Sequence, residues 1–468
     1  MRKNLLKTAL GILAMSAIIP LNAIAQDPVT ETPVVQTKDT EREFYLRPSY
    51  WIPYDQRGIN KFETTKEIDP IPFEGLRIRF GAGFTQQFQN IKHENTALNN
   101  TGTGANRLYP LAPGFMTAQA NLFTDVQLAD GIRLNLTTYL SSRHHNETWV
   151  KGGYIQFDKL PIKSGFLDKF MELATIKVGH MQNNYGDAHF RRSDAGDAIR
   201  NPFMESYIVD AFATEIGGEV YLQKNGLFGM VGVSNGMIKG HVDSLSSLKL
   251  NGTEVENTTK RSPSIYFKGG IDKSLAERLR VRVSGSLYHN SGTYGSGLTL
   301  YSGDRAGSQY QNVMENKPLG TASTSMYTSG RFNPGFRNEL TAIMLNGFLK
   351  AGGLELFGTY ETANGKSGVE KDKRNMNQLA GDLIYRFGAN ENFYIGGRYN
   401  TVNSELLFSG NMTDVKINRT ALAAGWFVTK NVLMKGEYVT QKYKDFPNTD
   451  FRNGGKFNGY VIEAVVGF

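Results

Sequence analysis

The chain ends in GYVIEAVVGF, residues 459–468, and this stretch decides the fold. Alternate residues form one apolar row, which runs from Tyr460 through Ile462 to Phe468, while the other row contains Glu463. Such alternation is typical of a β-strand with two different faces. In a soluble domain, a flat apolar row that reaches the last residue forms an edge strand that is prone to aggregation. In a closed membrane barrel, the same strand has a neighbour on each side and lipid against one face. The stretch predicts a barrel-closing strand, and the alternative is the last core strand of a soluble β-domain.

The N-terminus predicts a secretory signal over residues 1–25. Three basic residues precede an apolar run at residues 10–21, and small residues at 22–25 provide a cleavage site. The apolar run is too short to cross a membrane as a helix, and no later window holds the roughly 18 uninterrupted apolar residues that a spanning helix needs. If the protein sits in a membrane, it must do so as a barrel.

Composition narrows the function classes. The 468 residues include 51 Gly, 28 Phe and 22 Tyr but no Cys, which excludes disulfides, Cys-ligated metals and a lipoprotein anchor. The net charge of +8 falls to +5 when the three basic residues of the predicted signal are removed. This mild charge on an exported chain does not favour nucleic-acid binding, so no nucleic-acid partner is predicted.

Three segments are expected: the signal at 1–25, a Thr/Glu/Pro-rich periplasmic leader at 26–74, and a transmembrane barrel at 75–468. The leader is either a free tail or is partly packed in or under the barrel. Within the barrel, sixteen alternating segments predict an all-β, 16-stranded antiparallel transmembrane β-barrel, an even number as bacterial barrels require. The predicted strands lie at about 75–94, 114–129, 131–143, 149–158, 172–182, 211–223, 227–238, 263–273, 278–290, 338–350, 353–365, 375–388, 392–405, 415–428, 432–445 and 455–468.

The connections between these segments alternate between short turns and long loops. The long ones are expected near 95–113, 183–210, 239–262, 291–337 and 406–414. Short turns on one side and long loops on the other are typical of an outer-membrane barrel with both termini in the periplasm.

One face of the strands is apolar and the other carries charges, which belong in a hydrated lumen because a charge facing lipid costs about 2–4 kcal/mol. These charges either set ion selectivity or simply pair with each other inside the barrel. The arginines that we expect to line the pore are Arg77, Arg79, Arg133, Arg143, Arg280, Arg282, Arg386 and Arg398.

The loop between the fifth and sixth predicted strands, residues 183–210, mixes carboxylates with arginines. In trimeric porins the loop at this place folds inward, so its carboxylates could face arginines of the wall and create a transverse field that selects solutes. The alternative is an exposed surface loop. The residues expected at the constriction are Asp187, Arg191, Arg192, Asp194, Asp197, Arg200 and Glu205.

No catalytic constellation is evident. The seven His residues show no metal-ligand spacing with carboxylates, and no Gly-x-Ser-x-Gly turn occurs. We therefore predict no enzymatic activity, no catalytic residues, no metal site and no cofactor, while a barrel hydrolase stays open as an alternative.

Segments 188–194, 201–203 and 210–219 resemble outer-membrane porins of the Bacteroidota, and the order of parts over 75–468 is similar to the phosphate-selective porin family. The terminal Phe468 also resembles the assembly signal of Gram-negative outer-membrane proteins. The resemblance implies a passive, anion-tolerant channel.

These observations together predict a porin of the cell outer membrane that lets small hydrophilic solutes diffuse passively, with anionic solutes as one option. The alternative is a barrel subunit or scaffold of a larger outer-membrane complex without an open channel. The expected partners are outer-membrane lipids and small hydrophilic solutes, in a homotrimer or in an envelope complex.

Overall fold

The computed structural model describes residues 50–66, 71–97, 108–116, 118–141, 148–162, 164–193, 195–236, 247–250, 253–256, 261–293, 297–302, 309–316 and 329–468. The predicted signal and the first half of the predicted leader lie outside these residues.

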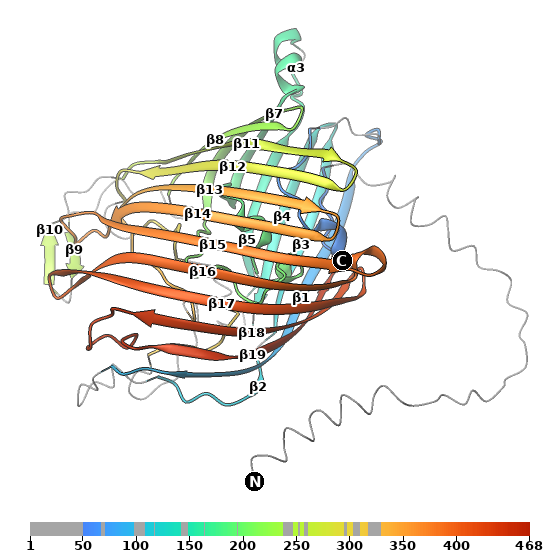
Figure 1. The fold of residues 1–468 in the computed structure, drawn as a ribbon. Helices are drawn as coiled ribbons and strands as arrows, with labels where there is room; N and C mark the ends of the chain where they lie inside the picture. The colour runs from blue at the N-terminus through green and yellow to red at the C-terminus, as the bar shows by residue number, and fades with distance from the viewer. Residues whose placement is uncertain are drawn as a thin grey trace, which may run out of the picture. The chain divides into compact units, whose positions relative to one another are not determined.

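Within the described residues, sixteen long antiparallel strands form a closed barrel (Figure 1). Strand β1 pairs with β3 on one side and with the last strand, β19, on the other, and β8 pairs directly with β11. Every barrel strand therefore has two neighbours, which confirms the predicted fold. The barrel strands are β1 (Arg77–Glu94), β3 (Gln119–Ala129), β4 (Ile132–Ser141), β5 (Thr148–Phe157), β6 (Ala174–Gln182), β7 (Thr214–Lys224), β8 (Leu227–Ser234), β11 (Ser264–Ala276), β12 (Leu279–Asn290), β13 (Glu339–Ala351), β14 (Leu354–Lys366), β15 (Arg374–Phe387), β16 (Phe393–Phe408), β17 (Asn411–Thr429), β18 (Val432–Lys444) and β19 (Lys456–Gly467).

The remaining elements belong to the connections. A two-residue strand pairs with β1, and two short strands form a hairpin in the connection between β8 and β11. We call the end of the barrel with the short connections the turn end and the opposite end the loop end. A short helix occupies the longest connection at the turn end, between β5 and β6. These elements are β2 (Gly114–Phe115), β9 (Ser247–Leu250), β10 (Thr253–Glu256), α3 (Gly165–Met171) and the 3-10 turns η1 (Gln56–Gly58), η2 (Ala188–Arg191), η3 (Ala195–Arg200) and η4 (Ala389–Glu391).

The C-terminal stretch closes the barrel down to its last residue. The backbone N–H of Phe468 donates to the carbonyl oxygen of Ala82 at 3.0 Å, and the N–H of Ala82 donates back at 2.9 Å. Ile462 and Phe468 are 48% and 62% exposed on the outside, whereas Glu463 is completely buried on the inside. The two rows seen in the sequence are therefore the lipid face and the interior face of the closing strand.

The same sorting holds around the barrel, since the exposed large hydrophobic side chains alternate with buried inward ones along the strands. At the turn end, the rings of Phe387, Phe393 and Trp426 stack across neighbouring strands with centroids about 6 Å apart. An apolar outer band with aromatic residues at its edge is the lipid-facing surface of an outer-membrane barrel. The protein is thus located in the bacterial outer membrane. The helices of the described residues are all too short or too polar to cross a membrane.

One predicted loop is wrong. Residues 406–414 were expected to form a long loop, but β16 and β17 stay paired as far as Phe408 and Asn411. The connection is a tight turn in which Ser409 and Gly410 both have positive φ, 48° and 83°. Such a turn matches the twist of the two strands and lets the ladder continue past the apolar band.

Candidate functional site

The long connection between β6 and β7, residues 183–213, folds into the barrel. A buried loop must satisfy its own backbone polar groups, and here the wall supplies the partners. The backbone N–H groups of Met204, Ile208 and Val209 donate to side chains of β18, β16 and β15, namely Glu437 at 2.8 Å, Asn400 at 2.6 Å and Gln378 at 2.9 Å. This loop, which we call the inner loop, therefore crosses the interior as an ordered element.

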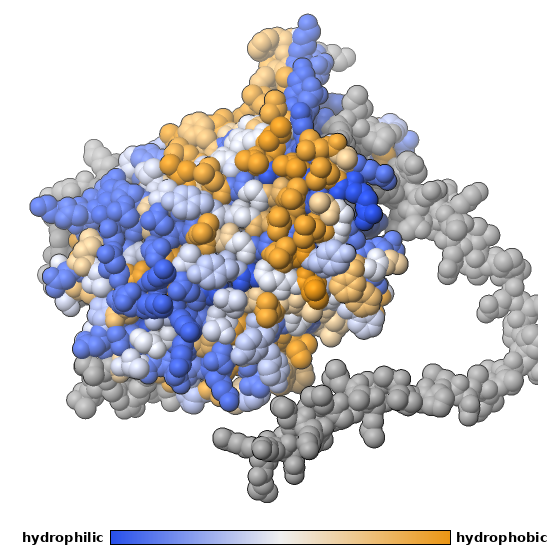
Figure 2. All heavy atoms as spheres, viewed as in Figure 1, coloured by the Kyte–Doolittle hydropathy of each residue, from blue (hydrophilic) through white to orange (hydrophobic). Residues whose placement is uncertain are grey.

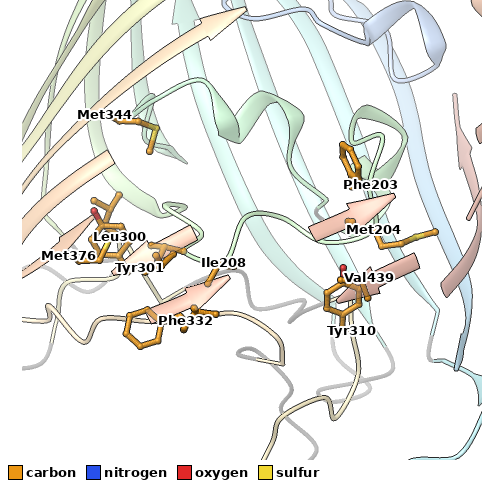
Figure 3. Close-up of a cluster of buried hydrophobic side chains, with 14 of the residues drawn as sticks. Phe203, Met204, Ile208, Leu300, Tyr301, Tyr310, Phe332, Met344, Met376 and Val439 are labelled. Atoms are coloured by element: carbon orange, nitrogen blue, oxygen red, sulfur yellow. The ribbon is translucent and has the colours of Figure 1, made fainter. Parts of the chain in front are cut away.

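Parts of the connection between β12 and β13 also lie inside and pack on the inner loop. Leu300, Tyr310 and Phe332 from this connection join Phe203 and Ile208 of the inner loop in one buried apolar cluster (Figure 3). Inward residues of the strands complete the cluster, among them Met344, Met376 and Val439. The side of the lumen that faces β12–β19, which we call the packed half, is filled by protein.

A buried charge cluster anchors the inner loop to the wall. The carboxylate of Asp187 accepts from Lys268 of β11 at 2.7 Å and from Arg282 of β12 at 2.8 Å. Glu63, which precedes the barrel, lies 2.9 Å from Lys268 and 2.8 Å from Arg282. Burial alone would raise the pKa of Asp187 and of Glu63, but the two cations outweigh it and hold both pKa values below the usual range.

Other inward arginines of the packed half are also neutralised. Glu355 of β14 lies 2.6 Å from Arg191 of the inner loop and 2.9 Å from Arg386 of β15. Arg398 of β16 pairs with Asp382 at 2.7 Å, and these side chains are at most 4% exposed. Charges that are paired and covered in this way cannot meet a passing solute in the described arrangement.

The opposite side of the lumen, which faces β3–β7, contains open space, and we call it the hollow half. Two neighbouring cavities of about 200 and 170 Å³ lie between the inner surface of these strands, η3 and residues preceding the barrel. Both are lined by Tyr154, Gln182, Asp197 and Arg200. This cavity pair is the candidate functional site.

The charges around the cavity pair are less completely neutralised than those of the packed half. Arg79 donates to Asp125 at 3.1 Å. Arg133 donates to the Tyr50 carbonyl at 3.1 Å and to Gln156, and Lys177 lies over the ring of Tyr221 at 4.7 Å. Among the described residues, neither Arg133 nor Lys177 forms an ion pair with a carboxylate.

Arg200 and Asp197 of η3 sit at the boundary between the two cavities. Their closest approach is 3.7 Å, and the side chains are 17% and 25% exposed. This pair is looser and more exposed than the pairs of the packed half, so solvent reaches both groups.

Part of the predicted leader enters the barrel. The ring of Tyr54 stacks on Phe123 of β3 with centroids 4.0 Å apart, and its hydroxyl donates to Asp125 at 2.8 Å. Further along, Asn60 donates to Glu355 at 2.8 Å. Residues 50–66 therefore narrow the lumen from the turn end and contact both halves.

The remaining predicted site residues are placed as follows. Arg77 lies near the turn end, 3.5 Å from Glu74, and Arg280 pairs with Asp272 at 2.7 Å. Arg192 pairs with Asp210 at 2.6 Å, and Glu205 accepts from the backbone N–H of Gln309 at 2.6 Å. Arg143 and Asp194 lie outside the described residues.

Sequence reasoning missed Lys151, which lines the larger cavity. The strand pairing skips this residue, since Thr137 pairs with Gly152 and Thr138 with Val150. Such a bulge inserts one extra residue and changes the direction of nearby side chains. Strict alternation along β5 could not have revealed it. Glu63 and Tyr54 were missed because a leader has no periodic pattern.

Within the described part of the chain, no group of three or more His, Cys, Asp or Glu side chains could hold a metal ion.

Comparison with known proteins gives resemblances of fold only. No protein-family model matches the chain, and neither does any curated protein. Among solved structures, an anion-selective porin from Comamonas acidovorans is similar, with 9% identity, a TM-score of 0.49 and coverage of 84% of this chain and 100% of that one. The outer membrane channel DcaP of Acinetobacter baumannii has 10% identity, a TM-score of 0.48 and coverage of 84% and 98%. OmpT of Vibrio cholerae has 9% identity, a TM-score of 0.46 and coverage of 85% and 99%. At these values solute and family do not carry over, and the porin-like barrel is established by its own strand pairing.

Proposed function

We propose that this protein is a porin through which small hydrophilic solutes, with a preference for anions, diffuse passively across the outer membrane. The route runs through the hollow half, past Lys151, Lys177 and Arg200. The single observation that carries the proposal is the presence of this wetter, charged space inside an otherwise packed barrel.

The preference for anions follows from the balance of charge. Six cationic side chains and four carboxylates line the two cavities. Asp125 pairs with Arg79, Glu63 pairs with Lys268 outside the cavities, and Arg192 pairs with Asp210 outside them. Among the remaining lining groups, cations still outnumber carboxylates by two. Fixed positive charge raises the local concentration of anions and lowers that of cations. The resemblance to phosphate-selective porins agrees with this direction, and oxyanions are the solutes we propose to test first.

The packed half favours a second candidate, a barrel that serves as a scaffold in a larger envelope complex. Two inward connections and residues 50–66 fill much of the lumen, which is an arrangement suited to a closed barrel. The two candidates differ in one measurable property, the passage of ions.

Planar-bilayer recording of the purified protein separates them. The porin proposal expects discrete conductance steps and, in a KCl gradient, a reversal potential that indicates preference for chloride. Absence of ion current from folded protein would end the porin proposal and leave the scaffold.

A double charge reversal, Lys151→Glu with Lys177→Glu, tests the route. One charge about 4 Å from an ion in water contributes about 1 kcal/mol, so the ratio of anion to cation permeability should fall several-fold. The matched control is Lys224→Glu with Lys273→Glu, two exposed lysines at the turn end outside the cavities. An unchanged reversal potential in the first variant would place the ion route elsewhere.

A further inference from the structure

Five lysines stand together on the outward face of the barrel wall, at the loop ends of four adjacent strands. Lys92 is on β1, Lys416 on β17, Lys442 and Lys444 on β18, and Lys456 on β19. Four of them are exposed and Lys416 is half-buried. We call this group the lysine cluster. It faces away from the lumen, so it takes no part in the proposed solute route.

The strand register places these lysines opposite one another. Lys416 pairs with Lys444 across β17 and β18, and Lys442 pairs with Lys456 across β18 and β19. Residues directly opposite in an antiparallel pair have Cβ atoms about 4.5–5.5 Å apart, and like charges in this position repel. Two such pairs side by side repel each other, and a bound anion between them would lower this repulsion.

The chain itself supplies little negative charge at this place. Glu94 pairs with Lys456 at 2.7 Å. Among the described residues, Lys92, Lys416, Lys442 and Lys444 form no ion pair, and Asp414 and Asp445 flank the cluster without bridging to it. The cluster therefore keeps a net positive charge.

The height of the cluster on the wall identifies its surroundings. Tyr438, Tyr460 and Phe88 form an aromatic row on β18, β19 and β1, with the rings of Phe88 and Tyr460 6.5 Å apart. Aromatic rows mark the membrane–water interface. Lys442 and Lys456 lie four residues from this row toward the loops, which is about 13 Å along a strand and about 10 Å along the membrane normal at the usual tilt.

Figure 2 shows the same division on the face it displays, where hydrophilic side chains gather toward the loop ends and hydrophobic ones toward the turn ends. The long loops lie on the extracellular side of such a barrel. The cluster is thus at the level of the headgroups of the outer leaflet, which in this membrane is built of phosphorylated glycolipid.

We propose that the lysine cluster binds the phosphate groups of an outer-leaflet glycolipid. Lysine binds phosphate as a compact point charge on a flexible stem, so neighbouring lysines can close around one headgroup while its acyl chains lie on the apolar band below. Bound phosphates would also relieve the repulsion between the opposed lysines. The site is a lipid-binding site on the outer wall, separate from the lumen.

Native mass spectrometry of the full-length barrel in detergent tests the proposal with a defined probe. The probe is a glycolipid of the lipid A type with both phosphates, and the comparison lipid is the same molecule after dephosphorylation. Wild-type protein should bind the phosphorylated form at least about tenfold more tightly. Equal binding of the two lipids, or complete displacement of the phosphorylated lipid by an excess of inorganic phosphate, would overturn the proposal.

A variant series locates the site. Lys416→Gln, Lys442→Gln, Lys444→Gln and Lys456→Gln combined should reduce binding of the phosphorylated lipid to the level of the dephosphorylated one. A control with the same charge change at the turn end, Lys169→Gln, Lys224→Gln, Lys273→Gln and Lys430→Gln, should bind as wild type does. Wild-type affinity in the first variant, with folding verified by its heat-dependent gel shift, would contradict the assignment.

Discussion

The strands around the two halves of the lumen have the same alternating pattern, but their inward side chains lie in different surroundings. On β12–β19 the inward side chains are nearly all buried, because the inner loop and the connection between β12 and β13 pack against them. On β4–β6 inward residues such as Asn135, Tyr154 and Lys177 stay partly exposed beside open cavities. A side chain that points inward is therefore not necessarily a side chain that meets solute.

The difference teaches how charge acts in each half. In the packed half, Arg282 and Asp187 are sealed together and behave as parts of a protein core. In the hollow half, Arg200 and Asp197 are separated by 3.7 Å and reached by solvent. The first kind of pair holds the inner loop in place, and the second kind borders the cavities through which we propose that ions pass.

The largest expected effect comes from breaking the charge cluster of the packed half. Asp187→Ala leaves Lys268 and Arg282 buried with fewer partners, and loss of one member of a buried pair costs about 3–5 kcal/mol. Urea unfolding of the barrel, followed by its gel shift, should show this loss. The matched variant Asp197→Ala in the hollow half should cost less than about 1 kcal/mol, because that pair is loose and partly exposed. Equal destabilisation by the two variants would show that the ion pairs of the two halves do not differ in their contribution to stability.

A second comparison uses apolar and aromatic side chains. Ile208→Ala in the packed half removes a fully buried side chain, so it should cost about 2–5 kcal/mol and leave the single-channel conductance unchanged. Tyr54→Ala in the hollow half removes a ring that lines the larger cavity, so it should raise the conductance. A conductance increase in the Ile208 variant alone would move the solute route into the packed half.

The smallest expected effect is the response to acid. Asp187 and Glu63 have pKa values held below their ordinary values of 3.8 and 4.5. Their contribution to stability is present above those ordinary values and is lost as the pH falls through the lower folded values. These two groups should therefore leave the urea midpoint nearly unchanged between pH 7 and 5. The midpoint should decrease once the pH is lower than about 4. In the Asp187→Asn variant, the urea midpoint should decrease less in acid than it does in wild type. If the wild-type midpoint already decreases between pH 7 and 5, and Asp187→Asn removes that decrease, the low pKa assigned to Asp187 would be wrong.

Much of the fold could be predicted from the sequence because lipid and water impose a period of two on every strand. The sixteen strands were predicted with ends within a few residues, and the exception at 406–414 arose because a hairpin can extend beyond the apolar band, where no lipid enforces alternation. The order of segments also predicted a long loop between the fifth and sixth strands, at residues 183–210, and the structure has this connection at 183–213.

The candidate site was less predictable. The arginines that sequence reasoning grouped as pore-lining fall into different environments, since Arg133 lies beside a cavity while Arg282, Arg386 and Arg398 are sealed under the inner loop. A period-two pattern predicts whether a side chain points inward or outward. It does not predict whether an inward side chain meets a packed loop or an open cavity. Lys151 was hidden for a related reason, because a bulge in β5 breaks the period on which the inference depends.

The sequence by itself determined a closed barrel with an apolar outer surface, since each strand must present one face to lipid and one to the interior. Only the tertiary structure decided which half of the interior is filled, because that depends on where residues 50–66 and two long connections come to rest. Those segments are fixed by hydrogen bonds and ion pairs between residues far apart in the chain, such as Glu63 with Arg282 and Met204 with Glu437, and no local pattern encodes them.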